Sequence, residues 1–186
     1  MQSGSQLSEV RIVVTDSEQL VTQDYKNTTT IVGKNRPSED FNYNLKNYPN
    51  YIYGFMSPLD SIIHKNVITK VMRIFDKYPI VSVIYTDLCI AKDDYEYLQF
   101  FPSASSDVFS KQIINAPVFV KPSNNKILFD ERLQHLYFHD FLKRAISKNL
   151  IHHIAEPLIK RTLSVKINTS MIELESIEDI KLLQHA

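Results

Sequence analysis

Three acidic residues stand where apolar segments give way to polar ones. Asp16 follows "EVRIVVT", Asp60 closes "YIYGFMSPLD" and Asp87 closes "IVSVIYTD". Ligands of α/β sheets bind beyond the carboxyl ends of the strands. These carboxylates, with the segment Ser57–Asp60, therefore predict a shared ligand-binding edge of a sheet. Aspartate is also a frequent turn former after a strand, so a plain turn is an equal alternative for each residue taken alone.

Other common chemistries lack the residues they need. The adjacent His152 and His153 would point to opposite faces of a strand, so they could not hold one metal ion together. Cys89 lies in an apolar run, which is typical of a buried, unreactive thiol. Neither a GxGxxG loop nor a P-loop can be built, because the chain has three glycines, which are Gly4, Gly33 and Gly54.

The composition is that of one globular domain. The chain has 186 residues, of which 44% are hydrophobic and 23% charged. This length supports one core and is too short for two comfortable domains. Lys and Arg total 21, as do Asp and Glu, so the formal net charge is zero. That balance argues against nucleic-acid binding and against electrostatic docking on anionic membranes.

The single cysteine excludes an intrachain disulfide and suits a reducing compartment. No stretch is long and apolar enough to span a bilayer, and the start "MQSGSQLSE" has no signal-peptide core. We therefore expect a cytoplasmic protein or a component of a soluble assembly. One domain is expected over 1–186, with 1–8 as an amino-terminal extension and 163–186 as a carboxyl-terminal tail.

Hydrophobic periodicity predicts strands alternating with helical segments. Helical spacing predicts a helix over 65–78, a second one within 129–149 that has Asp140 in its first turn, and a short one around Phe41–Leu45. The tail 176–186 is expected to form a short amphipathic helix or to fray. Apolar and β-branched runs predict strands within 9–18, 28–35, 51–56, 80–91, 92–102, 114–123 and 150–165, the last one turning at Pro157.

Strands separated by helical segments indicate an α/β fold with a mainly parallel sheet and a mixed edge. The order of these pieces resembles the family 2 glycosyltransferases, whose GT-A fold is a nucleotide-sugar-binding sheet flanked by helices. "IVSVIYTD" resembles that family's strand ending in Tyr-Ser-Asp. The run "INAPVFVKPSNNKILFDERLQHLYFHDFLKRAISKNLIHHIAEPLIKR" resembles its acceptor half, and the likeness spans roughly residues 8–162.

The resemblance implies a role for each of several acids. Asp16 would contact the uracil or ribose of a nucleotide sugar, and Asp60 matches the last acid of the metal motif. Asp140, in "FHDFL", would be the general base that takes the acceptor hydroxyl proton. Asp130 and Glu131 would border the acceptor site. An N-cap role for Asp140 and a solvated turn at Asp130–Glu131 are the alternatives.

Two departures from the family pattern bear on activity. A divalent Mn or Mg ion would neutralise the diphosphate leaving group, and it needs hard oxygen ligands. The matching positions here are Ser57, Pro58 and Leu59, so only Asp60 remains, and one carboxylate is a poor metal site. The family's first strand and helix also have no counterpart, which would leave an open apolar sheet edge for another protein chain to cover.

Two functions follow from this reading. The first is a glycosyltransferase that moves a sugar from a nucleotide sugar to a hydroxyl acceptor. The second is a catalytically inactive module of the same fold that serves as a structural or interaction component of a larger assembly. The aromatic, Asn-rich segment 41–53 favours the second function, because it could dock against protein.

Overall fold

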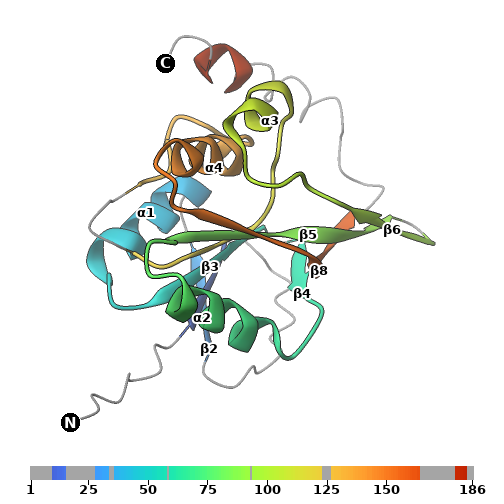
Figure 1. Ribbon diagram of the computed structural model, residues 1–186, viewed down its shortest axis with the longest axis horizontal. Coiled ribbons are helices and arrows are strands. Elements are labelled where there is room, and N and C mark those ends of the chain that lie inside the picture. Colours follow the sequence, from blue (N-terminus) through green and yellow to red (C-terminus); the bar gives the residue numbers. More distant parts are fainter. Residues whose placement is uncertain are drawn as a thin grey trace.

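The computed structural model describes residues 10–15, 28–33, 36–57, 59–92, 94–122, 127–163 and 179–183 (Figure 1). An eight-stranded sheet carries the fold. Its strands are β1 (Val10–Thr15), β2 (Thr28–Gly33), β3 (Ile52–Met56), β4 (Asp60–Ile62), β5 (Val83–Lys92), β6 (Tyr95–Gln99), β7 (Val118–Val120) and β8 (Ile151–Leu163). The helices are α1 (Pro37–Asn47), α2 (Val67–Lys77), α3 (Ser106–Lys111) and α4 (Tyr137–Ser147).

The strands lie in the order β2-β1-β3-β7-β5-β8-β4, and β6 pairs with β5 beside this path. Three pairings among the described strands are parallel, namely β1–β2, β1–β3 and β5–β8. The pairings β3–β7, β4–β8, β5–β6 and β5–β7 are antiparallel. The predicted α/β class and the mixed sheet are confirmed, with more antiparallel pairing than the sequence indicated.

The apolar strand β1, at which the sequence predicted an open sheet edge, has a partner strand on each side. β1 is hydrogen-bonded to β2 on one side and to β3 on the other, with Ile12 opposite Gly54 and Val13 opposite Phe55. The other side of β3 pairs with β7. Both sides of β1 and of β3 are therefore paired, and β2 is the outer strand at this end of the described sheet.

A glycine at position 54 allows this close strand packing. A Cβ atom built on Gly54 would lie 2.7 Å from Cδ1 of Ile12 and 3.1 Å from Cε1 of Phe119. Real Cβ atoms almost never come that close to another heavy atom, so the side chains above β3 fill the space that a larger residue would need.

Helix α1 is longer than the short helix expected around Phe41–Leu45. It starts at Pro37, and proline is well suited to a first helical turn because its missing N–H has no partner there anyway. Two short elements, β4 and α3, were not predicted. β8 is continuous across Pro157 with a register shift, since Thr86 pairs with Ile154 and Asp87 with Pro157, as expected for a strand that turns at this proline.

An aromatic cluster joins α1, α4 and the sheet, and it positions the start of α4. Phe129 stacks on Phe141 of α4 with the ring centroids 4.1 Å apart, and Phe41 of α1 lies 4.5 Å from Phe55 of β3. Figure 1 shows β5 and β8 running between α2 on one side and α3 and α4 on the other. Among the described residues, no helix is long and apolar enough to cross a membrane.

Candidate functional site

Asp140, the expected general base, lies in the first turn of α4 and is mostly buried. Its Oδ2 accepts hydrogen bonds from Nε and Nη2 of Arg144, at 2.9 and 2.5 Å. The N-cap residue of α4 is Leu136, and its side chain makes no capping hydrogen bond. The alternative N-cap role of Asp140 is therefore wrong, since its carboxylate pairs with an arginine one turn along the same helix.

Asp130 and Glu131 lie at a turn in which Glu131 is exposed, and both carboxylates accept hydrogen bonds from side chains. Asp130 accepts from the backbone N–H of Arg132 at 3.0 Å and from its guanidinium, with Nε at 2.9 Å. These hydrogen bonds to Arg132 hold the pKa of Asp130 below its usual value. Glu131 accepts from Nδ2 of Asn42 at 2.8 Å.

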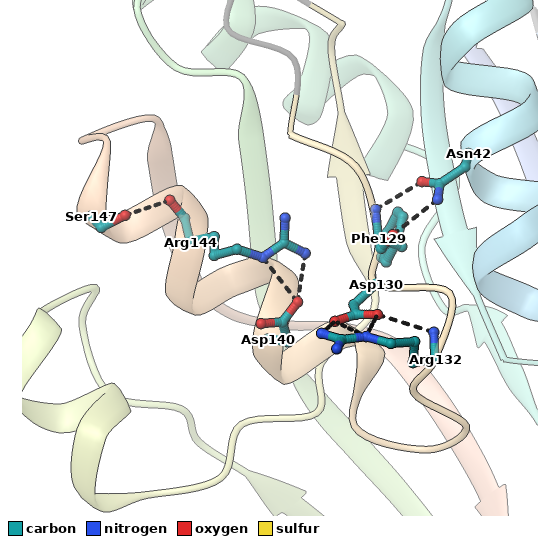
Figure 2. Close-up of polar contacts among 7 residues, drawn as sticks. All are labelled: Asn42, Phe129, Asp130, Arg132, Asp140, Arg144 and Ser147. Atoms are coloured by element: carbon teal, nitrogen blue, oxygen red, sulfur yellow. Dashed lines mark hydrogen bonds and ion pairs between the residues drawn. The ribbon is translucent and has the colours of Figure 1, made fainter. Parts of the chain in front are cut away.

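The structure places Asp130 and Asp140 close to each other. Figure 2 shows the Asp130–Arg132 pair next to the Asp140–Arg144 pair, on the turn before α4 and on α4 itself. The charge of Arg144 also lowers the pKa of Asp130, and the charge of Asp140 contributes to the raised pKa of Arg132. Two carboxylates and two guanidiniums thus lie close together in one small region.

Asn42 holds this region in place and was missed by the sequence reading. It is buried at 2% exposure on α1. Its amide donates from Nδ2 to the carbonyl oxygen of Phe129 at 2.9 Å and accepts the N–H of Phe129 through Oδ1 at 2.7 Å. Both polar groups of the Phe129 backbone are thereby satisfied at the residue before Asp130. The sequence signal that could have identified Asn42 is its position, as a polar residue between the apolar Phe41 and Leu45 of a helix.

Asp60, the expected metal ligand, forms an ion pair with Arg161. Its Oδ1 accepts from Nε of Arg161 at 2.7 Å, and its Oδ2 accepts from Nη2 of Arg161 at 3.0 Å and from the N–H of Ser57 at 2.8 Å. The Asp60 side chain is fully buried, and that of Arg161 is 15% exposed. Burial alone would lower the pKa of Arg161, but the charge and hydrogen bonds of Asp60 more than offset this and raise it.

This arrangement does not fit a divalent cation at Asp60. Both carboxylate oxygens already have donors, and a guanidinium stands beside them, so a metal ion would have to displace a buried ion pair. In the part of the chain that the structure describes, no group of three or more His, Cys, Asp or Glu residues is placed to hold a metal ion. The expected Mn or Mg site therefore has no support from the residues around Asp60.

Of the other two acids of the predicted ligand-binding edge, the structure describes only Asp87. Asp16 lies outside the described residues. Asp87 lies inside β5 rather than at its end and is 1% exposed, which corrects its expected place. Its Oδ1 accepts from the N–H of Phe101 at 2.8 Å and contacts Nε2 of His153 at 2.9 Å. The expected shared edge of Asp16, Asp60 and Asp87 is therefore not formed by the two that are described.

His152 and His153 face different neighbours, as predicted for adjacent residues of a strand. The His153 ring stacks on Tyr85, with the centroids 4.5 Å apart, and His152 stacks on Tyr78 at 5.5 Å. Burial lowers the pKa of His152 below its usual value. The two imidazoles thus serve in packing and in the buried contact with Asp87.

Asp179, a carboxylate from the carboxyl-terminal tail, accepts hydrogen bonds from the segment just before α4. Oδ2 of Asp179, which is 2% exposed, accepts from the N–H groups of His135 and Leu136 at 2.7 and 2.8 Å. The N–H of Gln134 lies 3.1 Å from its Oδ1. Residues 179–183 are helical, and Leu183 packs against the core. Asp179 therefore satisfies, from far along the chain, three N–H groups of the segment Gln134–Leu136, which leads into the first helical residue Tyr137.

Replacing Asp179 with alanine is expected to lower the free energy of unfolding by about 2 kcal/mol, because three N–H groups of the segment that leads into α4 would lose a charged acceptor. Chemical denaturation followed by circular dichroism measures the change. Lys181→Ala is the matched control, since Lys181 is exposed in the same helical segment. Equal stability of the two variants would show that the hydrogen bonds of Asp179 to the segment before α4 do not stabilise the fold.

Comparisons with known proteins add a fold to this geometry. No protein-family model matches the sequence, and no curated protein matches it. Among solved structures, the chain is similar to the crystal structure of S. aureus TarS 1-349, with a TM-score of 0.57 and 12% sequence identity. The similarity covers 83% of this chain and 60% of that chain, so the present chain spans less than two thirds of its length.

TarS is a glycosyltransferase. The chain therefore has a glycosyltransferase-like fold, in which a mixed sheet is flanked by helices. An identity of 12% establishes the fold alone, since one fold hosts many reactions. Membership of family 2 remains an expectation from the sequence.

Proposed function

We propose that the chain transfers a sugar from a nucleotide sugar to a hydroxyl acceptor, without a divalent cation at Asp60. The observation that carries the proposal is the placement of Asp140 and Asp130 side by side at the start of α4 in a glycosyltransferase-like fold. The other acid in this proposal is Asp16, as the contact to the nucleotide.

The proposed chemistry assigns one step to Asp140. The acceptor oxygen attacks the anomeric carbon of the donor sugar, the bond from that carbon to the nucleoside diphosphate breaks, and the hydroxyl proton passes to Asp140. Arg144 engages Oδ2 of Asp140 through both of its hydrogen bonds, so Oδ1 is the oxygen assigned to the proton. Asp130, Glu131 and Arg132 then border the acceptor.

A second function is favoured by a specific observation. The one acid that the resemblance assigns to the metal motif is neutralised by Arg161 and buried. A diphosphate leaving group would find no net positive charge at that pair. This supports a catalytically inactive module of the same fold, kept for its structure or for its interactions in a larger assembly.

Calorimetric titration with uridine diphosphate separates the two functions. The purified chain is titrated in EDTA and, separately, with Mn²⁺, and guanosine diphosphate serves as the control for the base. Equal micromolar binding of uridine diphosphate in both conditions is the result expected from a metal-independent transferase. Stronger binding with Mn²⁺ would contradict the metal-independent route. No heat in either condition would favour the inactive module.

A further inference from the structure

Strand β6 presents an unusually apolar open edge. Every residue of Tyr95–Gln99 is exposed, and β6 pairs with β5 alone among the described strands. Tyr95 is 78% exposed, Tyr97 52%, Leu98 51% and the following Phe100 65%. Figure 1 shows the tip of the β5–β6 hairpin projecting beyond the neighbouring elements of the sheet. Proteins commonly protect such an edge with charges, proline or a bulge, because its free N–H and C=O groups invite another strand.

The one charge on β6 does not protect this edge. Glu96 forms an ion pair with Nζ of Lys160 on β8, and the Sγ atom of Cys89 also contacts its carboxylate. Ala91 of β5 lies opposite Glu96, and Cys89 of β5 lies opposite Lys160 of β8. Glu96 and Lys160 therefore meet on one face of the sheet. Tyr95 and Tyr97 point to the other face, because side chains alternate along a strand. The free edge of β6 is therefore flanked by Tyr95 and Tyr97 on one face and by Leu98 and the paired Glu96 on the other.

We propose that β6 pairs antiparallel with β6 of a second copy of this chain and joins two sheets into one. A two-fold axis at Tyr97 would place Tyr97 opposite its own copy, Tyr95 opposite Gln99, and Glu96 opposite Leu98. No two like charges face each other in this register. The aromatic pair at the axis is among the favourable cross-strand contacts.

Charge balance favours a second copy as the occupant. The net charge of the chain is zero, so two copies have no overall repulsion to overcome. A strongly charged partner would find no complementary charge on β6, whereas an identical strand offers matching aromatic surface. Two exposed strands of five residues make a small interface, so we expect a weak dimer that forms only as the concentration rises.

Sedimentation velocity across a wide range of protein concentration tests the proposal. The wild-type chain is expected to shift from monomer to dimer as the concentration rises. Tyr97→Lys would bring two ammonium groups together at the axis and should weaken dimerisation by about ten-fold or more. Ile80→Lys is the matched control, because Ile80 is 67% exposed in the turn after α2 and lies outside β6. It should behave as wild type.

A charge-complementation experiment makes the register itself testable. Tyr97→Lys and Tyr97→Glu should each be monomeric alone, and an equimolar mixture should form the dimer again, since opposite charges would then meet at the axis. A wild-type chain that stays monomeric at every concentration would overturn the proposal. A dimer that survives Tyr97→Lys unchanged, or a mixture that stays monomeric, would also overturn it. The proposal is independent of nucleotide binding.

Discussion

Replacing Arg161 with methionine is expected to lower the free energy of unfolding by about 3–5 kcal/mol, because the fully buried Asp60 carboxylate would lose its charged partner. Only the N–H of Ser57 would remain as a donor to that carboxylate among its present partners. Methionine keeps much of the volume of the arginine stem, so the loss reports the unpaired charge rather than a cavity. Urea denaturation followed by circular dichroism measures it.

A double-mutant cycle is the control for this prediction. Removing both charges with Asp60→Leu and Arg161→Met together should restore most of the lost stability, since a buried ion pair can often be replaced by apolar residues of similar volume. A single Arg161→Met variant as stable as wild type would show that Asp60 has another partner or is solvated. Nucleotide binding by the double variant would also show whether the pair takes part in that function.

Asp140→Asn is expected to reduce sugar transfer by about 10²–10⁴-fold, the usual contribution of a positioned general base. Asparagine has nearly the same shape and can still accept a hydrogen bond from Arg144, but it cannot take up the acceptor proton. The measurement is the rate of nucleoside diphosphate release with a donor and acceptor that the wild-type chain uses. Binding of uridine diphosphate should be unchanged, because Asp140 is assigned to the acceptor side.

Asp76→Asn is the matched control for the Asp140 variant. Asp76 is exposed on α2, which lies on the other side of β5 from α4 (Figure 1). The control should keep the wild-type rate. Full transfer activity in Asp140→Asn would remove this residue from the mechanism, whereas equal losses in both variants would indicate a general effect on folding.

Much of the sheet could be predicted because the local amino-acid composition of its strands is typical of β-structure. β1, β2, β3 and β5 are runs of β-branched and aromatic residues, and the amphipathic spacing of α2 is equally clear. β4 and α3 escaped prediction because they are only three and six residues long. β4 exists because it pairs with β8, a contact that no local pattern reveals.

The sequence suggested candidate acids but not the side chains that pair with them. Asp60 was singled out by its place after an apolar strand, whereas Asp130 and Asp140 were implied by the family resemblance. The pairing of Asp60 with Arg161 joins residues 101 positions apart, and Asp179 reaches Leu136 over 43 positions. Such pairs depend on the completed fold. Asp87 was misplaced because β5 continues past it to Lys92 as a partner of β6 and β8.

The pairing of β4 with β8 also sets an order in which this chain can fold. β4 belongs to the first third of the sequence, yet its only described strand partner begins at Ile151. Contacts between residues so distant in sequence form late, because the long intervening loop must be closed first. During synthesis the amino-terminal strands could associate early, but Asp60 would wait without Arg161 until β8 had left the ribosome. The buried ion pair between Asp60 and Arg161, which leaves no place for a metal ion, would thus be one of the last contacts to form during folding.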